Sequence, residues 1–379
     1  MRKSFFAATI SLALFGSASG AQGALSLQGL GYPSGGVSAR AEGTGAGLAD
    51  FDALSLTAPA ALAGVGSAAI FFQYSPEFRK VTTTSGSAST TTARFPLVAG
   101  VLPMGRAWTL GLSSSTFLDR SSETNLTRTQ IVGAPTDTVT LIERNRVLGA
   151  INDVRLALAW ARSPAFRFGF GGHVFTGSNR VTFSQLFPDS SRYISTAQST
   201  RISYTGFAAS AGIEIHPSRV IGFSLTARKG GDLRAESADT TLGKGRLPDH
   251  YSASIAFEGI PGASIAARVA HDSWSSLTAL SSTGIQAFDG WDTGVGVEAA
   301  GPRIMQRIIT LRVGGRFRTL PFGLDGEKVT ENTLSAGLGL PLTRDRANFD
   351  FAVQRASRKA GSDIKERGYI LSFGLRVSP

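Results

Sequence analysis

The sequence has no cysteine, few charged residues and no long apolar run beyond its first twenty residues. The absence of cysteine excludes a disulfide framework and any metal site built on cysteine ligands. Charged residues occupy 17% of the 379 positions, below the roughly 25% of typical soluble proteins. A membrane-spanning helix needs ~20 consecutive apolar residues, and no segment after residue 20 provides them. Disulfide-rich and helical membrane proteins are therefore excluded.

Aromatic residues and glycine are plentiful. The chain contains 24 Phe, 6 Tyr, 4 Trp and 45 Gly, and this aromatic content excludes an intrinsically disordered protein. Lysine and arginine outnumber the acidic residues and give a net charge of +11. Because no nucleic-acid-binding motif accompanies this charge, we expect no nucleic-acid partner. Basic residues in loops are instead expected to bind anionic lipopolysaccharide.

The first 21 residues have the layout of a secretory signal peptide. A basic start, Met1-Arg2-Lys3, precedes a short apolar core from Ser4 to Phe15 and a small-residue stretch that ends near Ala21. The apolar core is too short to span a bilayer, which favours a cleaved export signal. We therefore predict an exported protein with residues 1–21 removed.

From about residue 65 onward, apolar residues recur at every second position. This is the period of a β-strand, whose successive side chains point to opposite faces. Two clear examples are Phe166, Phe168, Phe170 and Val174 against Arg167, Gly169, Gly171 and His173, and Tyr369, Leu371, Phe373, Leu375 and Val377 against Ser372, Gly374 and Arg376. The pattern predicts an all-β protein with one apolar and one polar or small-residue face.

The lengths of the connections distinguish a soluble sandwich from a transmembrane barrel. The predicted strands span residues 66–75, 92–102, 107–118, 146–161, 165–177, 199–215, 219–229, 249–258, 262–274, 288–298, 307–318, 331–341, 347–357 and 366–377. Six short turns, including Gly301-Pro302, alternate with seven longer loops such as Arg120–Asn145 and Gly230–Pro248. Outer-membrane barrels have an even strand number and short periplasmic turns opposite long outer loops. We therefore predict a fourteen-stranded antiparallel transmembrane β-barrel.

Tryptophan positions fit this barrel. The four tryptophans are predicted near strand ends, where the aromatic girdles of such barrels lie; they are Trp108, Trp160, Trp274 and Trp291.

Residues 22–63 do not alternate and precede the first strand. The stretch is rich in small residues and includes Gly43, Gly45 and Gly47, which suits tight bends and close packing. Two interpretations remain open from the residues alone: a hatch folded into the barrel lumen, or a flexible periplasmic tail.

This segment resembles the N-terminal signature of the FadL/TodX outer-membrane transport family. The similarity rests on Ser38–Gly47, Asp52–Ser55 and Ala58–Leu62, although Ala58 stands where the family usually has Asn. The resemblance implies a fourteen-stranded barrel (residues 64–379) and an N-terminal hatch (residues 22–63) that includes Gly43, Gly45, Gly47, Asp52 and Pro59. It also implies passive uptake of long-chain fatty acids or hydrocarbons through an opening in the barrel wall. The PorV-like shuttle proteins share this barrel, so a scaffold that binds exported cargo is the alternative function.

Several arginines fall on the predicted luminal face and are candidate ligand contacts. Arg155, Arg268, Arg312 and Arg316 could each pair with a fatty-acid carboxylate, since a guanidinium suits that geometry. The alternative, which we favour for any single arginine, is that they pair with luminal acids such as Asp153, Glu214, Glu258, Asp292, Glu298 and Asp350. Three aromatic residues at predicted outer strand ends and loop bases are further ligand candidates: Phe117, Phe187 and Phe288.

No catalytic, metal or cofactor site is predicted. His271, Asp272 and Ser273 are consecutive, but neighbours on a strand face opposite ways and cannot form a triad among themselves. We therefore expect a monomeric non-enzyme in the outer membrane of a Gram-negative-type bacterium. Its expected partners are a hydrophobic small molecule, membrane lipid and lipopolysaccharide.

Overall fold

One antiparallel sheet accounts for most of the chain. The computed structural model describes residues 31–379 except 84–85, 132–137, 189–192, 281–286, 305–306, 325, 343–345 and 361–363. The predicted signal peptide therefore lies outside the described residues. Three short helices are described: α1 (Ala39–Gly43) and the 3-10 helices η1 (Pro59–Gly64) and η2 (Trp274–Leu280). In the described chain, no helix has the length and apolar character needed to cross a bilayer.

Sixteen strands are described in chain order. They are β1 (Ala69–Thr83), β2 (Gly86–Met104), β3 (Trp108–Asp119), β4 (Ser122–Ile131), β5 (Thr138–Ser163), β6 (Phe166–Leu186), β7 (Thr196–Ser218), β8 (Ile221–Ser237), β9 (Thr240–Arg246), β10 (His250–Ile260), β11 (Ala263–Asp272), β12 (Gly290–Ile304), β13 (Arg307–Leu324), β14 (Glu327–Leu342), β15 (Ala347–Ala360) and β16 (Ile364–Val377).

Fourteen of these strands form a closed ring. The first strand pairs with the last, as in Ile70 opposite Val377, and β10 pairs directly with β8, as in Tyr251 opposite Ala227. Only β4 and β9 lie outside the ring, as hairpin partners of β5 and β8. The prediction of a closed fourteen-stranded antiparallel barrel is confirmed. Closure satisfies the backbone hydrogen bonds that an open sheet edge would leave unpaired.

The two faces of the wall alternate as the sequence predicts. On β5, Leu156 points outward and is 56% exposed, whereas Arg155 is buried in the lumen. On β6, Phe170 points outward and is also 56% exposed, whereas His173 is buried in the lumen. The outer face therefore carries a band of exposed apolar side chains around the ring. The lumen holds the charged residues, so the interior of the barrel is the polar side of the sheet.

Two segments predicted as long loops are largely strand. The segment Arg120–Asn145 contains β4 and the start of β5, and Gly230–Pro248 contains the end of β8 and all of β9. Their polar sequences hide the apolar alternation, but the threonines of Arg120–Asn145 favour strands and each hairpin satisfies its own backbone groups. The turn predicted at Gly301-Pro302 also lies inside β12.

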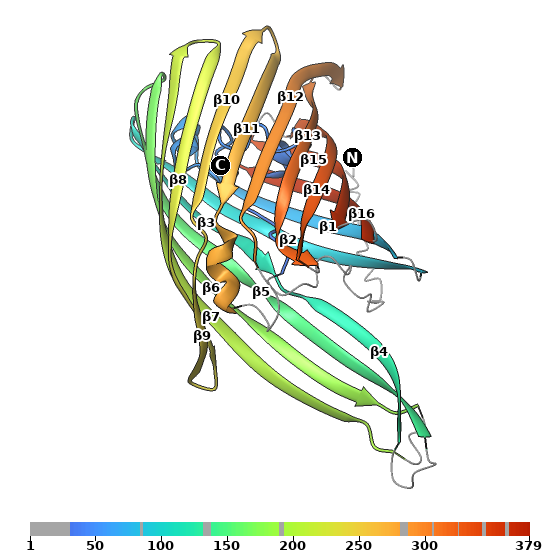
Figure 1. Cartoon of the computed structure of the whole chain (residues 1–379). Helices are drawn as coiled ribbons and strands as arrows, with labels where there is room; N and C mark the ends of the chain where they lie inside the picture. The colour runs from blue at the N-terminus through green and yellow to red at the C-terminus, as the bar shows by residue number, and fades with distance from the viewer. Residues whose placement is uncertain are drawn as a thin grey trace, which may run out of the picture.

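The strands β4 to β7 continue beyond the barrel as a projection that we call the arm. It consists of β4 and the adjoining ends of β5, β6 and β7, and it points away from the ring at the lower right of Figure 1. Pairing within the arm is continuous, from Ile131 opposite Thr138 to Gln185 opposite Thr196.

The N-terminal segment lies inside the barrel. Helix α1 packs against β13 to β16, and η1 packs against β3, β5, β6 and β7 on the other side of the ring. Ser38 caps α1, with its hydroxyl accepting a hydrogen bond from the Ala41 amide. Helix η1 begins with Pro59, and its N-cap residue Ala58 makes no side-chain capping bond. Residues 31–64 therefore fill much of the lumen.

Glycine allows this segment to approach the wall closely. A β-carbon at Gly314 of β13 would lie 2.2 Å from the Thr44 carbonyl carbon. Gly45 has a φ of +60°, in the left-handed region that favours glycine. The segment and β13 therefore meet backbone to backbone.

Candidate functional site

One side of the lumen holds a dense group of buried charges around Tyr32. We call it the ion-pair cluster; its members are Glu77, Arg79, Arg94, Arg318, Glu331, Arg358 and Glu366. Arg358 is fully buried and donates to three carboxylates: Glu77 at 2.8 Å, Glu331 at 2.5 Å, and Glu366.

Tyr32 connects the N-terminal segment to this cluster through hydrogen bonds and ring contacts. Its hydroxyl donates to Glu331 at 3.1 Å and accepts from Arg358 at 2.9 Å. Four guanidinium carbons lie 4.7 to 5.2 Å from the centre of its ring, within cation–π range; they belong to Arg358, Arg94, Arg318 and Arg79.

Three of the arginines predicted to meet a ligand are paired with protein carboxylates. Arg316 makes a bidentate pair with Asp292 at 2.6 and 2.7 Å. Arg312 bridges Glu298 and Asp350, both at 2.6 Å, and Arg268 contacts Asp50 and Asp292 at 3.1 and 3.2 Å. For these three residues the structure has the second of the two expected arrangements, pairing with luminal acids.

A cavity of about 130 Å³ lies in the lumen beside the N-terminal segment. A dry cavity of about 150 Å³ holds benzene in another protein, so this space suits a small molecule. Pro33, Gly35, Val37 and Leu56 form the side contributed by the N-terminal segment. Wall strands contribute the remaining lining, which is partly aromatic and partly charged.

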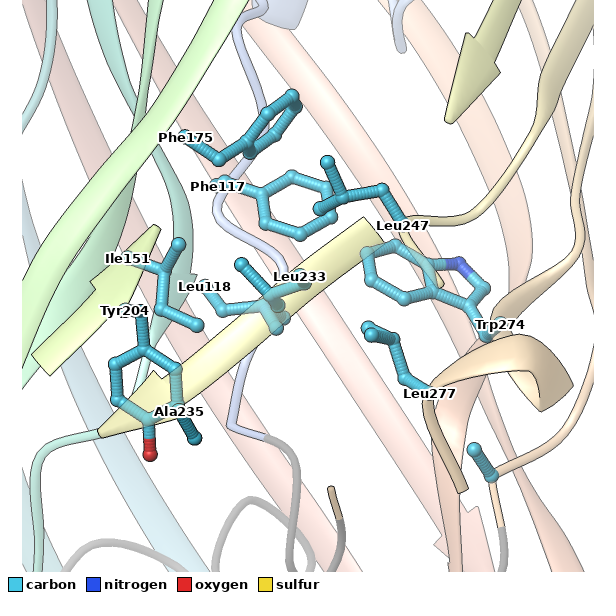
Figure 2. Close-up of a cluster of buried hydrophobic side chains, with 11 residues drawn as sticks. Phe117, Leu118, Ile151, Phe175, Tyr204, Leu233, Ala235, Leu247, Trp274 and Leu277 are labelled. Carbon is cyan, nitrogen blue, oxygen red and sulfur yellow. The ribbon is translucent and has the colours of Figure 1, made fainter. Parts of the chain in front are cut away.

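The aromatic lining continues into the largest buried apolar cluster (Figure 2). Phe117 stacks on Trp274, with ring centres 5.2 Å apart, and meets Phe175 edge to face at 4.8 Å. A bulge between Thr116 and Leu118 of β3 accompanies this inward placement of Phe117. Trp274 is 6% exposed, so the prediction that it lies in an outer girdle is wrong: η2 packs against β9 and places Trp274 on the inward-facing ring of Phe117.

Arg228 has the longest ion pairs among the arginines that line the cavity. Its guanidinium lies 4.0 Å from both Asp153 and Asp272. Its Nε is buried and has no hydrogen-bond partner among the described residues. The guanidinium carbon lies 5.6 Å from the Phe117 ring centre and 5.7 Å from that of Phe175. A cation thus faces the cavity beside an apolar surface.

Two histidine–aspartate pairs also line the cavity. His173 Nδ1 lies 2.9 Å from both Asp153 oxygens, and its Nε2 lies 2.8 Å from Ser210 Oγ. His250 Nδ1 lies 2.8 Å from Asp272 Oδ1, and its Nε2 lies 3.4 Å from Arg268. The described part of the chain contains no group of three or more His, Asp or Glu side chains arranged to hold a metal ion.

The remaining predicted residues are spread over the molecule. Phe117, Arg268 and Arg316 line the cavity, whereas Arg155 and Arg312 are not among its lining residues. Arg155 donates to the Leu56 carbonyl at 3.0 Å and so holds the N-terminal segment. Two phenylalanines lie elsewhere: Phe187 stacks on Tyr193 at the end of the arm, and Phe288 lies beside Lys328.

The predicted hatch residues all lie in the segment inside the lumen. Gly43 meets Arg312 and Gly337, Gly45 meets Gly315, and Gly47 meets Gly296. Asp52 accepts hydrogen bonds from Ser38, Ser55 and the Leu54 amide. Pro59 lies against Gly169 and Gly212 of the wall.

Sequence reasoning missed the contact of Asp153, His173 and Ser210. Alternation alone places Asp153 and His173 in the lumen, and the short turn Ser163-Pro164 lies midway between them. A hairpin about that turn brings the two positions together, as the observed pair Arg155 opposite His173 shows. Ser210 joins them one strand further on, where it lies opposite Gly171.

Comparison with solved structures finds the same barrel elsewhere. A FadL homologue of Pseudomonas aeruginosa superposes with a TM-score of 0.63 at 13% identity, over 92% of this chain and 99% of that one. The CymD monoaromatic hydrocarbon channel gives 0.57 at 12% identity, over 91% and 98%. The Pseudomonas putida toluene transporter TodX gives 0.55 at 13%, over 95% and 98%. No protein-family model and no curated protein matches the sequence. At these identities the likeness establishes the fold, that of FadL-type barrels.

Proposed function

We propose that the protein is an outer-membrane channel for passive uptake of hydrophobic small molecules, with residues 31–64 acting as its hatch. The observation that carries this proposal is the cavity between the N-terminal segment and the wall. Its lining combines stacked aromatic rings with an arginine that has only weak ion pairs. Such a lining fits a ligand with an apolar body and one polar or anionic end.

The outer surface supports a membrane location. Exposed apolar side chains occur on strands all around the ring, among them Leu112, Phe207 and Leu334 at 58%, 61% and 69% exposure. Soluble proteins rarely expose apolar area of this extent. Export through a signal peptide at residues 1–21 would deliver such a barrel to a Gram-negative-type outer membrane. A closed ring also supports a monomer, because it leaves no free strand edge in the wall.

Similarity of fold supports hydrophobic ligands as a class. The solved neighbours are described as a FadL homologue, a monoaromatic hydrocarbon channel and a toluene transporter. The cavity volume of about 130 Å³ favours a monoaromatic molecule or one end of a longer chain over a whole long-chain fatty acid. Oleate and toluene are therefore the two probes to compare.

A disulfide lock tests the hatch and the channel together. An ideal β-carbon at Gly374 of β16 lies 3.1 Å from the Ala39 β-carbon of α1 and 3.0 Å from the Phe71 ring, so an outward shift of a few tenths of an ångström brings the pair into the 3.5–4.5 Å range of a disulfide. The chain has no cysteine of its own, so the Ala39→Cys/Gly374→Cys variant would form one defined bond. We expect the oxidised variant to block uptake of labelled toluene or oleate by cells that lack their own transporter.

Reduction of the same variant is the matched control and should restore uptake. Each single cysteine variant should transport under both conditions. Folding is checked by the heat-shifted gel mobility of the barrel. If the wild-type barrel folds but neither probe enters faster than in cells without it, the channel proposal is wrong. If uptake proceeds with the lock closed, the hatch assignment is wrong.

The arm favours a second candidate, a scaffold that binds exported cargo. It exposes apolar side chains on a paired sheet beyond the ring, including Leu126, Leu148 and Phe183 at 50%, 43% and 42%. Arg128, Arg144 and Arg146 are also half-exposed there. Co-purification of one cargo protein that depends on the arm, without ligand uptake, would favour this function.

A further inference from the structure

Three side chains on neighbouring strands are arranged as a nucleophile, a base and an orienting carboxylate. Ser210 of β7, His173 of β6 and Asp153 of β5 are each less than 10% exposed, and all three line the luminal cavity. The Ser210 Oγ to His173 Nε2 distance is 2.8 Å, and His173 Nδ1 lies 2.9 Å from the Asp153 carboxylate. These distances are within the range of a nucleophile–base–orienter set.

The hydrogen-bond directions follow from the groups themselves. A carboxylate can only accept, so the Nδ1 that faces Asp153 carries a hydrogen. In the neutral imidazole, Nε2 is then the acceptor for the Ser210 hydroxyl, which is the direction that activates a serine. Gly171 leaves the space for this contact, because a β-carbon there would lie 2.6 Å from Ser210 Oγ.

Arg228 lies where a developing negative charge would need a donor. It is paired directly opposite Ser210 across β7 and β8, so their side chains share the luminal face as close neighbours. Its buried Nε has no partner among the described residues. A guanidinium can donate to an oxyanion at such a site. The apolar surface of Phe117, Phe175 and Trp274 lies beside it.

We propose that Asp153, His173 and Ser210 form a serine-esterase site that hydrolyses small carboxylic esters with an apolar or aromatic acyl group. This activity goes beyond the proposed uptake function and does not depend on it. Consecutive residues on one strand cannot form a triad, because their side chains alternate between the two faces of the sheet. Residues on three neighbouring strands can, when their side chains share the luminal face.

The reaction balances with water as the only co-reactant. Ser210 Oγ attacks the ester carbonyl while its proton passes to His173 Nε2. The carbon–alkoxide bond then breaks, and Nε2 returns the proton to the leaving oxygen, which departs as an alcohol. A water next gives a proton to Nε2 and attacks the acyl carbon. The bond to Oγ breaks, Oγ recovers that proton, and the carboxylic acid leaves and ionises in solvent.

The test uses the full-length barrel in detergent micelles with a fluorophosphonate probe and p-nitrophenyl butyrate. We expect the probe to label the wild type on the peptide that contains Ser210, as mapped by mass spectrometry. Ser210→Ala should show no label, and its ester hydrolysis should fall by about 10⁶-fold or to background. His173→Gln should be labelled at least about 100-fold more slowly.

A second serine gives the matched control. Ser113 of β3 is a buried luminal serine whose Oγ has no hydrogen-bond partner among the described residues. Ser113→Ala should therefore keep wild-type labelling and hydrolysis. Asp153 positions His173 without touching substrate, so Asp153→Asn should lower kcat by about 10⁴-fold and leave KM nearly unchanged.

If a variant fails to fold, labelling and ester hydrolysis by the wild type alone test the proposal. A folded wild-type barrel that is not labelled at Ser210, and hydrolyses the ester no faster than empty micelles, overturns the proposal. In that case the three residues are a structural hydrogen-bond chain between strands. Because micelles involve no transport, a negative result here leaves the uptake proposal untouched.

Discussion

The two sides of the lumen solve the problem of buried charge in opposite ways. Around Tyr32, Arg358 meets three carboxylates. Across the lumen, Arg228 has only two pairs, both 4.0 Å long, and a buried Nε without a partner in the described chain. Taking a charge out of water costs several kcal/mol unless close partners replace the water. The difference teaches that one side of the lumen pairs its buried guanidinium groups closely with carboxylates, whereas the other side leaves Arg228 with long ion pairs and an unpaired Nε, the donor that the proposed ligand would use.

Removing the centre of the ion-pair cluster should have the largest effect. Arg358→Met would leave Glu77, Glu331 and Glu366 buried with fewer partners. Breaking a buried charge network in this way costs about 3–5 kcal/mol. Urea titration of the barrel in detergent, followed by gel mobility, should show the loss. Unchanged unfolding would mean that the cluster adds nothing to stability and would remove the contrast between the two sides.

Glu42 of α1 lies on the same side of the lumen as the ion-pair cluster. Its protonation should make the attachment of α1 to the wall depend on pH. Burial raises the pKa of Glu42 to about 7 from 4.5, and its Oε2 has no hydrogen-bond partner among the described residues. A raised carboxyl pKa gives stability that is complete below pH 4.5 and is lost as pH rises through about 7. A rise of this size is worth at most about 3–4 kcal/mol.

Hydrogen exchange of residues 39–47 measures this effect. After correction for intrinsic rates, we expect faster exchange at pH 8 than at pH 5. Glu42→Gln should exchange equally at both values. An equal rate in the wild type would show that Glu42 does not control how firmly α1 is held.

The Tyr32 hydroxyl should contribute a smaller amount. Tyr32→Phe keeps the ring between the guanidinium groups but removes the hydrogen bonds to Glu331, Arg318 and Arg358. We expect a loss of about 1–3 kcal/mol, as for hydrogen bonds to charged groups. Limited proteolysis of the N-terminal segment should speed up accordingly. No change would indicate that the ring contacts alone anchor the segment.

The smallest stability effect is expected on the cavity side. Arg228→Met should lower the free energy of unfolding by no more than about 1 kcal/mol, because its ion pairs are long and removal of a buried guanidinium also removes the cost of its desolvation. Binding of benzoate, a small aromatic anion, should nevertheless weaken by about tenfold, as measured by tryptophan fluorescence. A stability loss like that of Arg358→Met would contradict the distinction between the two sides.

The alternation of apolar and polar residues along the chain determined much of this protein's fold. The period-two alternation correctly predicted fourteen wall strands and the luminal position of Arg155, His173 and Arg316, because the pleat alone decides which face a side chain takes. It failed at the arm, where Thr- and Arg-rich strands lack apolar alternation. It failed also for Trp274, which η2 carries into the lumen.

Only the tertiary structure decided which luminal groups meet. Tyr32 and Glu331 are 299 residues apart in the chain, and Asp153, His173 and Ser210 come from three strands. Alternation gives the face of each residue, but strand register, bulges and the course of residues 31–64 set its height and its partner. Those features depend on how the whole ring closes around the N-terminal segment. The sequence by itself therefore determined the wall and its two faces, whereas packing within the closed lumen decided which charges are paired and which remain available.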